Sequence, residues 1–210
     1  MRFLDYWGGV LLAPREWFKV ILSEGGGFKE AFLTVLVFGT IKWASIISSL
    51  RHFVRYFVPV TVPVPMGLIG DLVRTAGALL FAVGIIADFI VWLLWGLVAY
   101  ILMRLMGGAG DLEPTMAVLG FTWIFMVPAL VPLALTPWYP LSGIVVALFV
   151  RLLTYLWSFY VAGMGLSEAH GVNLARGILA VILPAFLPIA LILLAAAAKV
   201  LLSTKLLLWW

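Results

Sequence analysis

The stretch AGALLFAVGIIADFIVWLLWGLVAYILM, residues 76–103, decides the fold. It is apolar on all sides and carries one charged residue, Asp88. A bilayer core about 30 Å thick is crossed by about 20 helical residues, so the stretch is long enough to span a membrane. It lacks the period of two that the strands of a membrane barrel show. The stretch therefore predicts a transmembrane helix.

The whole chain has the composition of such a segment. Of its 210 residues, 65% are hydrophobic and 10% are charged, and the mean hydropathy is +1.21. A soluble domain is about 45–50% apolar and about 25% charged. This composition excludes a cytosolic enzyme, a disordered tail and a nucleic-acid-binding module. The chain is predicted to be an all-α integral membrane protein.

Five stretches are long and apolar enough to span, which predicts a five-helix transmembrane bundle. They are residues 31–50, 76–103, 115–135, 141–166 and 178–202. Residues 30–210 then form the transmembrane domain, and residues 1–29 form a separate N-terminal segment. The run 51–75 contains three prolines among valines and is expected to be an extended excursion at the membrane surface.

The N-terminal segment predicts an amphipathic helix that lies in the headgroup region. Pro14 opens it, and its apolar side chains recur at helical spacing: Trp17, Phe18, Ile21 and Leu22. Its charged side chains fall on the other side: Arg15, Glu16 and Lys19. Counting Lys and Arg in the loops does not fix the orientation. This basic segment favours a cytoplasmic N-terminus.

Charges inside predicted spans are expensive unless they are paired or hydrated. Lys42, Asp88 and Arg151 are three such residues. Asp88 and Arg151 fall roughly 15–18 Å from the same membrane face, and Lys42 about 12 Å from it. The three are predicted to form one cluster around Asp88. The cluster is either a structural ion pair or a proton- or ion-coupled site in which Asp88 titrates against Arg151. In a third alternative each charge snorkels alone.

Two loops on the predicted cytosolic face form the other candidate site. They contain Gly107, Gly108, Gly110, Asp111 and Glu113, and then Ser167 and Glu168. The glycines predict a turn, the acids suit a helix N-terminus, and Ser167 is expected to cap a helix. The glycine pattern is weak evidence for a phosphate site, because no strand precedes it and no Walker lysine follows.

Neither a catalytic set nor a metal site is predicted. The chain has no cysteine, and its histidines, His52 and His170, fall on opposite sides of the membrane in this topology. We therefore expect no cofactor and no enzymatic activity. The tryptophans are expected to serve mostly as interface anchors, as at Trp92, Trp95, Trp138, Trp157, Trp209 and Trp210.

A possible internal repeat in the sequence is compatible with a transport function. At an offset of 55 the stretch from Tyr100 aligns with the stretch from Tyr155, and each is followed by a span with a proline pair. A duplication would make the second and third spans a parallel repeat of the fourth and fifth, as in some transporters. It would equally suit a bundle that transports nothing.

The pattern resembles the Yip domain family, five-span membrane proteins named for interacting with Ypt/Rab GTPases. Residues 14–18 look like the proline-plus-aromatic stretch before the family's first span. Residues 105–113 are similar to its glycine-rich loop, and residues 117–121 with Pro128 to its alanine, glycine-aromatic and proline pattern. Residues 157–169 resemble its glycine followed by a serine-led helix start.

The resemblance implies a five-helix bundle with a cytosolic N-terminus and a role in membrane trafficking or shaping. It also implies lipid contact, self-association or other membrane proteins as partners, and no enzyme. The short chain looks like a prokaryotic member, which implies a prokaryotic cell membrane. The alternative is a small ion- or solute-translocating protein with Lys42, Asp88 and Arg151 in its pathway.

Overall fold

The computed structural model describes residues 2–25, 27–61, 66–126, 128, 130 and 140–186, and their regular structure is helical throughout. The elements are α1 (Arg2–Leu12), α2 (Pro14–Ser23), α3 (Phe28–Thr61), α4 (Met66–Leu105), α5 (Leu112–Phe121), the 3-10 helix η1 (Thr122–Met126) and α7 (Pro140–His170). An apolar helix, Leu174–Phe186, follows α7. The predicted all-α fold is confirmed for these residues.

Three helices are long and apolar enough to cross a membrane, over Phe28–Arg51, Arg74–Leu105 and Val145–His170. They correspond to the predicted spans 31–50, 76–103 and 141–166. The other two predicted spans are described only in part. Their described portions belong to shorter apolar helices, Leu112–Met126 and Leu174–Phe186, and most of the remainder lies outside the described residues. The count of five spans stays a prediction.

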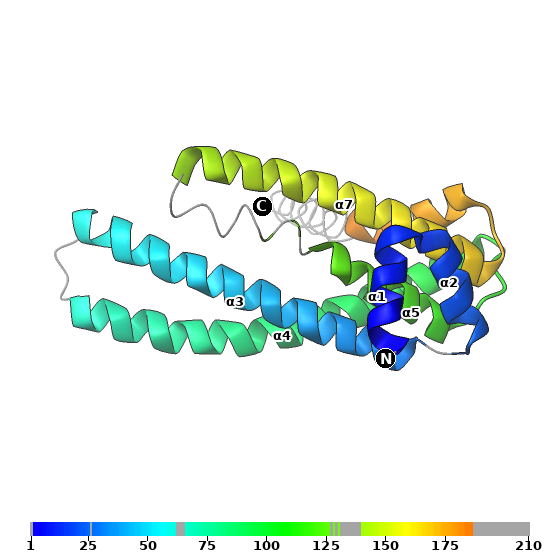
Figure 1. The fold of residues 1–210 in the computed structure, drawn as a ribbon, viewed down its shortest axis with the longest axis horizontal. Helices are drawn as coiled ribbons and strands as arrows, with labels where there is room; N and C mark the ends of the chain where they lie inside the picture. Colours follow the sequence, from blue (N-terminus) through cyan, green and yellow to red (C-terminus); the bar gives the residue numbers. More distant parts are fainter. Residues whose placement is uncertain are drawn as a thin grey trace, which may run out of the picture.

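The extended excursion expected over residues 51–75 is wrong for most of that run. α3 continues to Thr61, and α4 begins at Met66. Pro59 lies in the last turn of α3, two residues before the helix ends at Thr61. The apolar run therefore lengthens two helices that pack against each other (Figure 1).

The helices form a bundle with one packed end. In Figure 1, α3, α4 and α7 run along the long axis, and α1, α2 and α5 gather at one end. Most of the largest buried side chains come from this end, including Phe18, Met103, Phe121 and Leu166. By contrast, α4 and α7 expose long aliphatic faces, with Leu79 at 66% and Leu148 at 64% exposure. Such faces suit contact with lipid.

Small residues let the helices approach closely at two crossings. A Cβ added at Gly120 of α5 would lie 2.6 Å from the Cβ of Ala31 on α3. A Cβ at Gly177 would lie 2.1 Å from the carbonyl oxygen of Gly163 on α7. Larger side chains at these crossings would push the helices apart, as at the small-residue interfaces of membrane helices.

Candidate functional site

Asp88 is held from both sides by residues of α3. Lys42 Nζ donates a hydrogen bond to Asp88 Oδ1 at 2.5 Å, and Trp43 Nε1 donates one to Asp88 Oδ2 at 3.0 Å. Asp88 is buried, at 7% exposure. The Lys42 ammonium also lies over the rings of Trp43 and Trp123, 5.3 and 5.0 Å from their centroids, which adds a cation–π attraction. The structure thus brings Lys42 and Asp88 together.

The predicted pair of Asp88 with Arg151 does not form. Arg151 is exposed on α7, where its Nη2 and Nε donate to Tyr155 Oη at 3.1 and 3.3 Å. Tyr155 lies one turn further along the same helix, so Arg151 has a local partner. Asp88 meets α3 instead, because α3 and α4 are adjacent helices. The sequence predicts similar depths for Asp88 and Arg151, but a shared depth does not determine which helices are neighbours.

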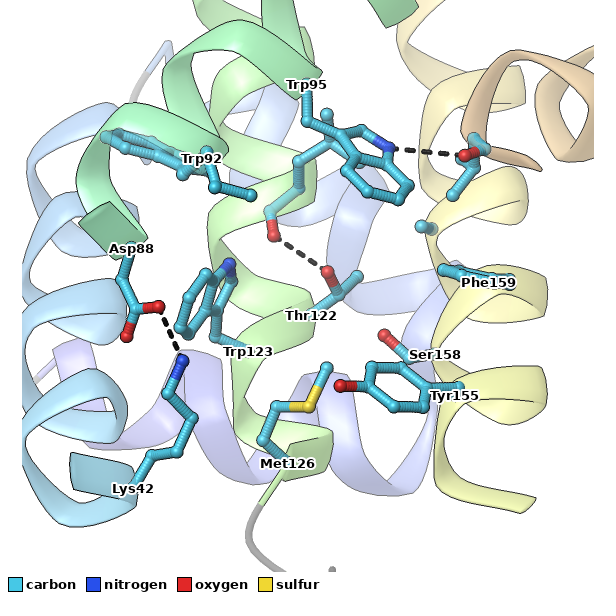
Figure 2. A pocket seen from close by; sticks show the side chains of 14 residues that line it. Lys42, Asp88, Trp92, Trp95, Thr122, Trp123, Met126, Tyr155, Ser158 and Phe159 are labelled. Carbon is cyan, nitrogen blue, oxygen red and sulfur yellow. Dashed lines mark hydrogen bonds and ion pairs between the residues drawn. The ribbon is translucent and has the colours of Figure 1, made fainter. Parts of the chain in front are cut away.

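A cavity of about 230 Å³ adjoins the Lys42–Asp88 pair. Its walls come from α3, α4, α5, η1, α7 and the helix Leu174–Phe186. Most of its lining is aromatic or aliphatic, and Figure 2 shows the rings gathered around it. They belong to Trp92, Trp95, Trp123, Tyr155 and Phe159. An aromatic cavity beside a few polar groups is the usual form of a small-molecule site.

Two tryptophans expected at the membrane surface instead build this cavity. Trp92 is 2% exposed, and its Nε1 donates to the Met116 carbonyl at 3.1 Å. Trp95 Nε1 donates to the Val181 carbonyl at 3.2 Å. These bonds join α4 to α5 and to the helix after α7. Sequence reasoning also missed Trp123, Tyr155 and Ser158 as lining residues, because neither charge nor motif distinguishes them.

The predicted glycine loop packs against the end of α7. Gly107 has φ +87°, which glycine adopts at low cost. The Ala109 N–H donates to the His170 carbonyl at 3.1 Å, and a Cβ at Gly110 would lie 2.3 Å from the Ala169 carbonyl oxygen. A Cβ at Gly108 would meet His170 Cβ at 2.9 Å. Residues 107–110, which follow α4, therefore pack closely against the C-terminal end of α7.

The acids of this loop begin α5. Asp111 is its N-cap residue, with no hydrogen bond from its side chain to the cap, and Glu113 lies in the first turn. Both are exposed, and their charges suit the positive end of the helix dipole. Thr115 Oγ1 donates to the Asp111 carbonyl at 2.8 Å and lies 2.8 Å from Nε2 of buried His170. Because the Thr115 proton is already used, His170 Nε2 donates to Thr115.

Ser167 is not a helix cap. α7 continues through it to His170, and Ser167 Oγ donates to the Met164 carbonyl at 2.7 Å. The helix stops at Gly171, which has φ +65°, and Asn173 Oδ1 accepts from the Arg176 N–H at 3.0 Å to cap the next helix. A glycine after the last helical residue and an asparagine before the next helix are the relevant signals.

Glu168 fixes the N-terminal hairpin formed by α1 and α2. Arg15 Nε donates to Glu168 Oε1 at 2.8 Å, and Lys19 Nζ lies 3.8 Å from Glu168 Oε2. The hydrogen bond and charge of Glu168 raise the pKa of the Arg15 guanidinium above its usual value. The Tyr6 hydroxyl donates to Glu24, and Trp7 Nε1 donates to Thr34 Oγ1 at 2.8 Å. Side chains therefore join the hairpin to α7 and α3.

Residues 14–23 form the expected helix, but the face predicted to meet lipid is divided. Phe18 and Ile21 are 0% and 1% exposed inside the protein, and Trp17 and Leu22 are half-buried. Phe18 fits beside Gly165 of α7, where an added Cβ would lie 2.9 Å from its ring. Packing on α7 therefore replaces the expected lipid contact at Phe18.

The described side chains contain no metal site, and what they offer is helix packing and a cavity for a ligand. Among the described residues no group of three or more His, Cys, Asp or Glu side chains is placed to hold a metal ion. His52 lies in α3 and His170 at the end of α7. In the described part of the chain, the cavity beside Lys42 and Asp88 offers a ligand apolar walls and a few polar groups.

Comparison with known proteins gives one match. The family model described as the Yip1 domain matches residues 8–197, most of the chain. Neither a curated protein nor a solved structure matches the chain.

Proposed function

This chain belongs to the Yip1 domain family, and on that premise we propose that it organises or shapes membranes through contacts with lipid and with proteins. The apolar helices and the family make it an integral membrane protein. In this proposal five spans place the N-terminus in the cytoplasm of a prokaryotic cell. The protein acts without catalysis and associates with itself or with other membrane proteins.

The hairpin of α1 and α2 is the observation that carries this proposal. One of its faces is fixed to the bundle through Phe18 and the Arg15–Glu168 pair. Its other side leaves Leu4 and Leu12 exposed at 67% and 88%, with Leu11 at 45%. An amphipathic helix with basic residues inserts its apolar side about 5–10 Å into the headgroup region. Insertion into one leaflet expands that leaflet and favours curvature.

Sorting among vesicles of different radius tests the proposal. The full chain is reconstituted into anionic vesicles of mixed size, and its density is measured on each vesicle by fluorescence microscopy. We expect the wild type to accumulate on small vesicles. The variant Leu11→Glu/Leu12→Glu should lose about half or more of this enrichment, because each charge opposes insertion of the hairpin.

Glu16→Gln is the matched control, since Glu16 is exposed on the same hairpin. It should sort as the wild type does. Equal density of the wild type on small and large vesicles would overturn the proposal.

A second candidate function, translocation of an ion or solute, is favoured by the cavity that adjoins Lys42 and Asp88. Both Asp88 oxygens accept hydrogen bonds, however, as expected of a structural pair. A flux assay in proteoliposomes with a pH-sensitive dye and a panel of ions separates the two functions. Flux that disappears in Asp88→Asn would establish translocation, and the absence of flux in the wild type would favour the membrane-organising role.

A further inference from the structure

The cavity beside Lys42 contains hydrogen-bond donors that have no acceptor among the described residues. Ser158 lines the cavity and is 5% exposed, yet its hydroxyl forms no hydrogen bond within the described part of the chain. Its oxygen is not sealed inside the protein, because His170 Nδ1 is the one fully buried side-chain nitrogen or oxygen without a partner among the described residues. A polar group that opens into an apolar cavity is usually paired with a partner when the cavity is filled. The Ser158 hydroxyl has no partner among the described residues, so it is available to a ligand in the cavity.

Two further donors lie in the same walls. Tyr155 Oη accepts from Arg151, so its own proton remains available to donate. Trp123 Nε1 forms no hydrogen bond to any described residue. The neighbouring Trp92 and Trp95 differ, because backbone carbonyls already accept from their N–H groups. Figure 2 shows the oxygens of Tyr155 and Ser158 directed into the cavity, across from Lys42 and Asp88.

Lys42 and Asp88, on the opposite wall of the cavity, determine which net charge a ligand can carry. Lys42 and Asp88 neutralise each other, and both carboxylate oxygens already accept hydrogen bonds. A cation or an anion placed beside this neutral pair would keep its own charge buried without a counter-charge, which is costly. The site therefore favours a neutral molecule that brings acceptors and no charge.

The shape and the walls define the body of that molecule. Apolar cavities of about 150 Å³ bind benzene, so a cavity of about 230 Å³ accommodates a somewhat larger ring system. Trp95 and Phe159 stack with their ring centroids 6.2 Å apart, which offers flat aromatic surface.

We propose that this cavity binds a neutral, lipid-soluble ring compound with carbonyl oxygens, of the quinone class, which accepts hydrogen bonds from Ser158, Tyr155 and Trp123. The site is independent of the membrane-organising role. Binding needs no covalent step, and because the chain has no cysteine, thiol adducts of a quinone probe cannot form.

Equilibrium dialysis with the full chain in lipid nanodiscs tests the proposal. Uptake of 2-methyl-1,4-naphthoquinone is compared with uptake by empty nanodiscs of the same lipid, which corrects for partition into the bilayer. The probes 2-methylnaphthalene and palmitate replace it in parallel, the first without acceptors and the second with a negative charge. We expect saturable binding of the quinone that is at least about tenfold tighter than binding of either other probe.

Variants locate the site. Ser158→Ala and Tyr155→Phe should each weaken quinone binding about threefold to tenfold, because each removes one neutral hydrogen bond. Ala162→Phe should abolish binding by filling the cavity, which Ala162 lines. If Ala162→Phe fails to fold, the two smaller substitutions still decide. Leu152→Ala, on the exposed face of α7, is the matched control and should bind as the wild type does.

Three results would overturn the proposal. They are the absence of saturable binding, tighter binding of palmitate, or equal binding of the quinone and 2-methylnaphthalene with no effect of Ser158→Ala.

Discussion

Two ion pairs join a basic and an acidic side chain in two different regions of the molecule. Lys42 and Asp88 meet between α3 and α4, where the exposed fractions of their side chains are 18% and 10%. Arg15 and Glu168 meet at the packed end, where those fractions are 70% and 20%. The chemistry of the two pairs is alike, and their surroundings differ.

Because the Lys42–Asp88 pair is buried and the Arg15–Glu168 pair is exposed, the two pairs contribute differently to stability. Removing one partner of a buried pair leaves a charge without compensation, whereas an exposed pair contributes little because water and salt screen it. We infer that the first pair fixes how α3 lies on α4. The second pair orients the hairpin, while buried Phe18 and Ile21 supply most of the energy that holds it.

The largest effect is expected at the buried pair. Asp88→Ala leaves the Lys42 ammonium and the Trp43 N–H without their acceptor. We expect a loss of about 3–5 kcal/mol in the free energy of unfolding. Titration with SDS in mixed micelles, followed by circular dichroism, measures it.

A double variant is the control for that loss. Lys42→Met/Asp88→Leu removes both charges and keeps similar volumes, so it should recover most of the stability. If Asp88→Ala unfolds at the same SDS fraction as the wild type, the buried pair is not a structural lock.

An intermediate effect is expected at Phe18, where the hairpin meets α7. Phe18→Ala removes a fully buried ring beside Gly165 and should cost about 3 kcal/mol. Because the loss falls on the docking of α1 and α2, amide hydrogen exchange should rise in residues 2–23 and stay unchanged in α4. Equal acceleration in α4 would show that the hairpin is not a separate unit.

The smallest effect is expected at the exposed pair. Glu168→Gln keeps an acceptor for Arg15 but removes the charge. Hydrogen exchange in the hairpin should rise slightly at low ionic strength, and this difference should vanish near 1 M salt, where the Debye length is about 3 Å. A large increase that persists in high salt would contradict this, because it would show that the Arg15–Glu168 pair, like Phe18, supplies much of the energy that holds the hairpin.

The sequence predicted those features that depend on local patterns. Lys42 and Asp88 stood out because charges within apolar helices need partners. Helix α2 followed from Pro14 and from the spacing of its apolar residues. The same rule for charges predicts Arg151 in a cluster with Lys42 and Asp88, but its partner is Tyr155, because side chains four residues apart meet on one helix.

Features that depend on contacts between distant segments were missed. Phe18 is buried because Gly165 on α7 leaves room for its ring, and neither position reveals the other. Trp123 and Ser158 carry no motif, and their place in the cavity follows from how η1 and α7 pack. The glycines 107–110 were expected to turn the chain, but their close approach to His170 requires the folded bundle.

The depth of the hairpin in the bilayer tests the central claim most directly. Because the chain has no cysteine, single cysteines at Leu12 and Leu152 can each carry a nitroxide label in the reconstituted protein. Accessibility to oxygen and to a water-soluble nickel chelate then gives each depth by electron paramagnetic resonance. We predict a label at Leu12 about 5–10 Å into the headgroup region, and a label at Leu152 deeper in the hydrocarbon. A Leu12 label as accessible to the chelate as a label free in water would contradict the account.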